Sequence, residues 1–120
     1  MTRMSVEEFK TLSAAQIKRG TTNKYRNEAL IFQGQRFDSK KELSDYQTLK
    51  LAEIGGKIRA VVRQVSFPLQ GSTRRIRVDF MIVENDGRIR FCDSKGFATP
   101  EWLGKQKQIR EAYGIDIQVI

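Results

Sequence analysis

The sequence contains no histidine and only one cysteine, and these two shortages narrow the chemistry open to it. Without histidine, a serine–histidine–aspartate triad, a histidine general base and a zinc site with histidine ligands are all excluded. The single Cys92 cannot form a disulfide within one chain, so a reducing cytoplasm is the expected compartment. Any hydrolytic reaction must therefore depend on carboxylates, lysine, tyrosine or a hard metal ion.

The chain also lacks a long apolar run. No stretch approaches the roughly 20 residues that cross a bilayer, and the opening MTRMSVEEFK does not resemble a signal peptide. Positive charge is what the chain has in excess, because 22 Lys+Arg against 14 Asp+Glu give a net charge of +8. This balance favours a polyanionic partner such as DNA, RNA or an anionic surface, although a basic protein without such a partner stays an alternative.

The length of 120 residues suits a single compact α/β domain with an N-terminal extension. Residues 1–24 are expected to form a helix followed by a linker and a basic arm, and residues 25–120 the main domain. Ser5 and Glu8 have the spacing of a capping box, which predicts a helix from about residue 6, ended by a linker at residues 20–23.

Hydrophobic periodicity and turn residues predict the remaining elements. A helix capped by Ser39 and a helix opened by Pro100 are expected, the latter stopped by Gly114. The predicted strands are 29–32, 35–37, 58–69, 74–83, 88–95 and 115–120, and the predicted helices are 39–54 and 100–113. The order of helix, three strands, helix and strand predicts a mixed central sheet flanked by helices.

Two carboxylates on neighbouring predicted strands are candidates for a catalytic site. Asp79 interrupts the apolar run of residues 76–83, and an unpaired buried carboxylate is costly enough to need a partner or a metal ion. Asp93 and Lys95 lie two residues apart, so they share one face of the following strand. An isolated pair of this kind is most often an ordinary ion pair, and it is Asp79 that raises the prospect of a shared site.

The turn between these strands decides whether Asp79 meets Asp93. A three-residue connection over residues 85–87, with its glycine left-handed, places the two aspartates opposite each other. A two-residue turn at 86–87 instead pairs Asp79 with Ser94 and puts the carboxylates on opposite faces. The sequence permits either turn.

A third carboxylate, Glu42, lies in the first turn of the helix that Ser39 caps. On a helical wheel it falls between Tyr46 and Leu49, which directs it toward the core. Ser39 and Glu42 also have the spacing of a capping box, a structural role, and both interpretations stay open.

The order of Glu42, Asp79 and Asp93-Ser94-Lys95 resembles the PD-(D/E)XK nuclease superfamily. The segments RFDSKKE (36–42), VDF (78–80) and DSKGF (93–97) are similar to a family of small phage endonucleases related to Holliday junction resolvases. The resemblance covers residues 24–118. Val78 stands where the superfamily name has proline, and Gln108 and Tyr113 do not match the helix signature of the exonuclease branch.

This resemblance implies a restriction-endonuclease-like αβββαβ core, here with an extra N-terminal helix. It implies Mg²⁺ or Mn²⁺ bound by Asp79, Asp93 and the backbone carbonyl of Ser94, with Glu42 binding directly or through water, and hard oxygen ligands suit these ions. Lys95 would orient or deprotonate the attacking water and stabilise the charge that grows on the phosphate.

The implied activity is structure-specific cleavage of branched DNA, such as a Holliday junction, by a phage-encoded homodimer in the host cytoplasm. A nonspecific or nicking nuclease is one alternative, and a noncatalytic nucleic-acid-binding protein is another. Basic side chains are candidates for contacts to the DNA backbone, although a charged helix face is more often only solvated. These candidates are Lys24, Arg26, Lys40, Arg74, Arg75, Arg77, Lys105, Lys107 and Arg110.

Overall fold

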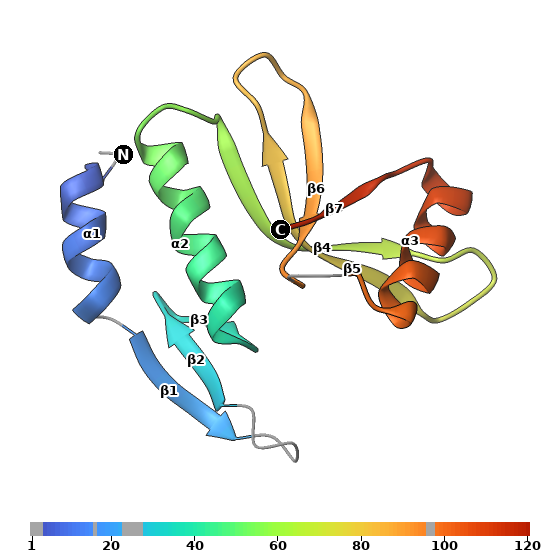
Figure 1. Ribbon diagram of the computed structural model, residues 1–120, viewed down its shortest axis with the longest axis horizontal. Coiled ribbons are helices and arrows are strands. Elements are labelled where there is room, and N and C mark those ends of the chain that lie inside the picture. Colours follow the sequence, from blue (N-terminus) through green and yellow to red (C-terminus); the bar gives the residue numbers. More distant parts are fainter. Residues whose placement is uncertain (1–3, 16, 23–27, 96–97) are drawn as a thin grey trace. The chain divides into compact units, whose positions relative to one another are not determined.

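The computed structural model describes residues 4–15, 17–22, 28–95 and 98–120 (Figure 1). They belong to two compact units, Met1–Lys57 and Ile58–Ile120. The boundary expected between residues 24 and 25 falls outside the described residues, and the main domain expected over residues 25–120 draws on both units. None of the helices in the described part of the chain combines the length and apolarity of a membrane span.

The first unit begins with a helix whose start agrees with the capping signal in the sequence. Ser5 Oγ accepts a hydrogen bond from the Glu8 backbone N–H at 3.1 Å, and Ser39 Oγ accepts one from the Glu42 N–H, also at 3.1 Å. Both predicted helix starts are therefore confirmed. The elements are α1 (Val6–Ala15), β1 (Ile17–Thr22), β2 (Glu28–Phe32), β3 (Gln35–Phe37) and α2 (Lys40–Ile54).

Residues 17–22 differ from the sequence prediction. The linker expected at Gly20–Thr22 is wrong, because Ile17–Thr22 forms strand β1, antiparallel to β2, in a sheet of order β1-β2-β3. Ile17, Thr21 and Thr22 are β-branched and favour strands. The strand that pairs with β1 is β2, which comes after residues 23–27 in the sequence, and no local pattern in β1 indicates this pairing.

Aromatic rings join the helices and the sheet of this unit. The Phe32 ring meets that of Phe9 edge-on at 5.8 Å and that of Tyr46 at 6.3 Å, and Phe37 lies 5.2 Å from Tyr46. Phe9, Phe32 and Phe37 are fully buried. These contacts connect α1, the sheet and α2 in one core.

The second unit contains a four-stranded mixed sheet of order β4-β5-β6-β7, in which only β6 and β7 are parallel. Its elements are β4 (Ala60–Pro68), β5 (Arg75–Val83), β6 (Ile89–Asp93), α3 (Pro100–Tyr113) and β7 (Ile117–Val119). Together with α2, the chain order is helix, three strands, helix and strand, as the sequence predicts. The protein therefore has a mixed α/β fold.

Helix α3 packs on this sheet through an apolar face. It begins where Thr99 Oγ1 accepts a hydrogen bond from the Trp102 N–H at 3.1 Å, and it ends at Gly114, whose φ of 70° is left-handed. Trp102 and Ile109 form a core cluster with Ile76, Val78 and Ile117. This packing fixes the face of α3 that carries Trp102 against β5.

Candidate functional site

The β5–β6 hairpin brings Asp79 and Asp93 together. Gly87 has a φ of 91°, and the Glu84 N–H bonds the Arg88 carbonyl at 2.8 Å, so the three-residue connection is confirmed. Phe80 pairs with Cys92, which makes Asp79 and Asp93 the next opposed pair. The two-residue alternative is wrong.

Each of the two carboxylates is held by the backbone of the opposite strand. Asp93 Oδ1 accepts the Asp79 N–H at 2.9 Å, and Asp79 Oδ2 accepts the Ser94 N–H at 3.0 Å. At this point the two strands are thus joined by hydrogen bonds from backbone N–H groups to carboxylate side chains. The arrangement fixes the positions of two negative charges close together.

Asp93 is fully buried and carries two further hydrogen bonds from α3. Its Oδ2 accepts Trp102 Nε1 at 3.0 Å and Lys105 Nζ at 2.6 Å. A buried carboxylate needs such partners, because an uncompensated charge inside a protein is strongly destabilising. Sequence reasoning missed this role, because it assigned Lys105 only to contacts with the DNA backbone and gave Trp102 no part in the site. Their i, i+3 spacing on a predicted helix is the signal that they share one face.

The surroundings of Asp79 disfavour the ionised form of its carboxyl group. Burial raises the pKa of its carboxyl group above the ordinary value, and the charge of Asp93 raises the pKa further. The Ser94 N–H and the ammonium groups of Lys105 and Lys95 lower the pKa in part. A cation bound at Asp79 would therefore stabilise its ionised form.

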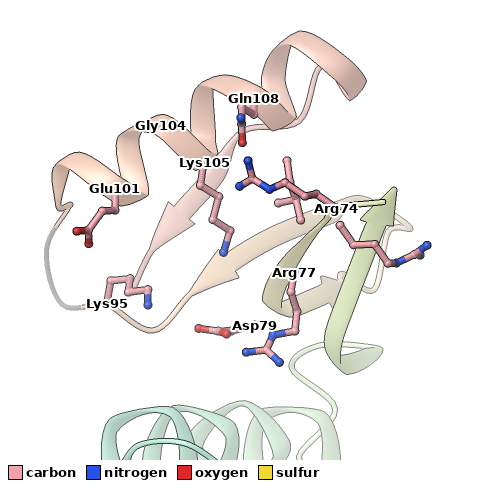
Figure 2. A pocket seen from close by; sticks show the side chains of 10 residues that line it. Arg74, Arg77, Asp79, Lys95, Glu101, Gly104, Lys105 and Gln108 are labelled. Atoms are coloured by element: carbon pink, nitrogen blue, oxygen red, sulfur yellow. The ribbon is translucent and has the colours of Figure 1, made fainter. Parts of the chain in front are cut away.

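Asp79 lines a pocket of about 460 Å³ between β5 and α3 (Figure 2). Figure 2 shows Lys105 reaching into this space from the helix, while Lys95 approaches the same end of the pocket as Asp79. Cationic side chains outnumber acidic ones, because only Asp79 and Glu101 oppose them in the lining. The cationic lining residues are Arg74, Arg75, Arg77, Lys95 and Lys105. This lining suits a ligand that carries several negative charges.

The donor set at the pocket fits a hard divalent cation. Asp79 supplies a carboxylate in the pocket lining, the fully buried Asp93 lies directly behind it, and the Ser94 hydroxyl is buried without a hydrogen-bond partner among the described residues. In the described part of the chain, no three His, Cys, Asp or Glu side chains form a group able to hold a metal ion. Further ligands would accordingly be the Ser94 carbonyl, water or substrate oxygens.

The other predicted site residues are distributed over both units. Glu42 is buried in the first unit, where its N–H takes part in the cap of α2, and a metal-binding role for it stays a prediction. Lys40 is exposed at the start of the same helix. Lys24 and Arg26 lie outside the described residues. Lys107 is exposed, and Arg110 pairs with Asp116 at 2.5 Å. Neither of these two residues lines the pocket.

A family comparison places these residues in one sequence family. The family model DUF1064, described as a protein of unknown function, matches residues 22–119. The chain belongs to the DUF1064 family. No curated protein and no solved structure matches the chain. The range of the DUF1064 match includes Glu42, Asp79, Asp93 and Lys95.

Proposed function

We propose that this DUF1064 protein is a metal-dependent endonuclease that hydrolyses phosphodiester bonds in DNA. The observation that carries the proposal is the Asp79–Asp93 pair beside Lys95, at one end of a pocket lined mainly by cations. A paired carboxylate site attracts a divalent ion, and a cationic lining attracts phosphates. The two features together are the requirements of phosphodiester hydrolysis.

The fold is consistent with the PD-(D/E)XK resemblance. The elements α2-β4-β5-β6-α3-β7 follow the αβββαβ order of a restriction-endonuclease-like core. On this proposal the acidic motif residues are Asp79, in the middle of β5, and Asp93, the last residue of β6. Lys95 follows Asp93 at the spacing of that motif.

Each residue of the proposed site has a distinct task. Asp79, Asp93 and the Ser94 carbonyl would hold Mg²⁺ or Mn²⁺. When bound, the metal polarises the phosphoryl oxygen and makes a water molecule more acidic. Lys95 orients this water and stabilises the charge that develops on the phosphate.

The cationic side chains of β5 bind phosphates that flank the cleaved bond. Arg75 is one of these side chains, and its Nε donates to Ser66 Oγ at 2.7 Å, which orients its guanidinium group. Contacts to phosphates position the DNA without reading its sequence. Arg74 and Arg77 line the same pocket and share this role.

We further propose branched DNA, such as a four-way junction, as the substrate, and a phage-encoded homodimer acting in the host cytoplasm as the active form. The support is the resemblance to small junction-resolving phage endonucleases. A symmetric dimer would cut two strands of a junction in a coordinated way.

The test is incubation of the protein with a four-way junction, a linear duplex and single-stranded DNA, with and without Mg²⁺. Cleavage should require the metal and should be fastest on the junction.

Asp79→Asn should abolish cleavage while DNA binding is kept or strengthened, because a charge that repels phosphate is removed. Lys107→Ala, on the exposed side of α3, is the matched control. DNA binding without cleavage in Mg²⁺ or Mn²⁺ would favour a noncatalytic protein, and equal cleavage of all three DNAs a general nuclease.

Lys95→Ala separates catalysis from phosphate anchoring. We expect the single-turnover rate at saturating protein to fall by roughly 10²–10³, the typical effect of one positioned electrostatic group. The affinity for DNA should change far less. Weaker binding with an unchanged saturated rate would assign Lys95 to anchoring only.

A further inference from the structure

We infer that Lys105 is a positioning residue that competes with the metal ion for Asp93, an inference that rests on the proposed function. Lys105 Nζ lies 2.6 Å from Asp93 Oδ2, at the carboxylate assigned to the metal. The protein therefore carries its own cation at this site.

The ion pair between the two residues stabilises a charge that the fold has fully buried. The side chain of Asp93 has an exposed fraction of 0%, and both of its oxygens already accept hydrogen bonds. Two of the three donors are rigidly placed, because one is the backbone N–H of Asp79 and the other the indole of Trp102, which is 8% exposed. Lys105 is the donor that can leave.

Lys105 has both the freedom and the space to move away from Asp93. Its side chain is 25% exposed and lines the pocket, and lysine carries its charge on a flexible four-carbon stem. An ammonium and a divalent ion at the same carboxylate oxygen repel each other strongly. A metal ion at Asp93 would therefore displace Lys105 from Oδ2 toward the pocket that it already lines, where the phosphates are proposed to bind.

If Lys105 competes with the metal ion, its replacement should have the opposite effect to that of replacing a residue that only holds Asp93 in place. Removing the Lys105 charge should strengthen metal binding while it weakens the metal-free fold, because Asp93 then lacks its counter-ion. A residue that only supports the site would weaken metal binding when it is replaced.

The experiment is calorimetric titration of Mn²⁺ into the wild-type protein and Lys105→Met, which keeps the apolar stem. We expect Lys105→Met to bind Mn²⁺ at least about tenfold more tightly, since one adjacent unit charge is removed. Without metal, the Tm of Lys105→Met should be lower than that of the wild type. Added Mn²⁺ should raise the Tm of Lys105→Met by more than it raises that of the wild type. Lys105→Arg keeps the charge and should stay within a few fold of the wild type.

Two controls separate direct competition from general electrostatics. Lys107→Met removes a charge from the same helix outside the pocket, and Arg75→Met removes one from the pocket lining away from Asp93. Neither should strengthen Mn²⁺ binding as much as Lys105→Met. An equal gain in Arg75→Met, or an unchanged or weaker affinity in Lys105→Met, overturns the inference.

Failure of the inference and failure of the proposed function give different results. If the wild type binds Mn²⁺ and Asp79→Asn does not, the metal site stands whatever Lys105 does. If neither the wild type nor Lys105→Met binds Mn²⁺, the metal-dependent function fails and the competition fails with it. If Lys105→Met does not fold without metal, Lys105→Gln, whose amide can still donate to Asp93, gives the same comparison.

Discussion

The ionisation of Asp79 is a balance of opposing interactions at a single residue. Burial and the neighbouring Asp93 raise the pKa of this carboxyl group, so the folded state holds its proton more tightly than the unfolded chain does. Stability is then lost as pH rises from the unfolded pKa through the raised folded pKa, and above this range Asp79 destabilises the metal-free protein.

Asp79→Asn should accordingly raise the Tm of the metal-free protein at pH 7 by roughly 2–5 °C. The amide oxygen can still accept the Ser94 N–H, so the main change is the loss of a buried charge. Scanning calorimetry at neutral and at acidic pH checks this, because the gain should shrink where the wild-type carboxyl is protonated. Mg²⁺ should stabilise the wild type and leave the variant unchanged. A lower Tm for the variant at pH 7 would mean that the lysines and Ser94 outweigh burial.

Residue spacing indicated Asp79, Asp93 and Lys95 as candidates, but it left two turns open, and only one of these brings the two aspartates together, as the structure does. The contact between Lys105 and Asp93 was not predicted. It joins a strand end to a helix whose rotation about its axis depends on packing by Trp102 and Ile109. Sequence periodicity assigns a face to a helix, and the exact partner of a long lysine follows only from the packed structure.

At the scale of elements, local sequence signals predicted most of the order of helices and strands. The missed strand β1 is explained by its pairing with a residue segment farther along the chain. Ser39, Pro100 and Gly114 define helix ends through interactions within a few residues, and α2 and α3 agree with them. Strand β1 depends on β2, which lies across residues 23–27, so its own short sequence with a central glycine did not reveal it. A left-handed Gly87 suits both turns that the sequence permits, and the pairing of Glu84 with Arg88 in the structure is what distinguishes them.

Gln64 is an element-level feature that no sequence pattern indicated. It has a φ of 56° in the middle of β4, although the register continues unchanged from Arg63–Phe80 to Val65–Val78. That register places Gln64 opposite Asp79. A left-handed conformation costs a non-glycine residue about 1–2 kcal/mol, so the strand stores strain beside the carboxylate pair.

Gln64→Gly should therefore keep or raise the Tm, whereas Gln64→Val should lower it by several degrees, since β-branched residues avoid this conformation. Gln33 is the matched control, because it has a φ of 52° and is exposed in the β2–β3 turn beside Gly34. Gln33→Gly should be stabilising in the same way. Thermal unfolding of the variants decides the matter, and a Gln64→Gly protein less stable than Gln64→Val would show that the side chain, not the backbone, governs this position.

At the scale of the whole molecule, the net charge of +8 gives a general attraction for polyanions, and the pocket concentrates part of the positive charge. Composition predicted the sign of the partner's charge because long-range electrostatics depend on the sum of charges. It did not predict which cations would act together. That depends on β5 and α3 forming two walls of one pocket.

The salt dependence of binding distinguishes the pocket cations from the remaining surface charge. For duplex DNA, each neutralised phosphate contributes about −0.9 to the slope of log Kobs against log salt concentration. In the non-cleaving Asp79→Asn background, Arg74→Ala should reduce the magnitude of that slope by about 0.9 and weaken binding similarly for every sequence. Lys107→Ala, outside the pocket lining, should change it much less. Fluorescence anisotropy between about 50 and 200 mM salt measures the slopes. If Lys107→Ala reduced the slope as much as Arg74→Ala, DNA would bind through diffuse surface charge, and the pocket would lose its assignment as the phosphate-binding site.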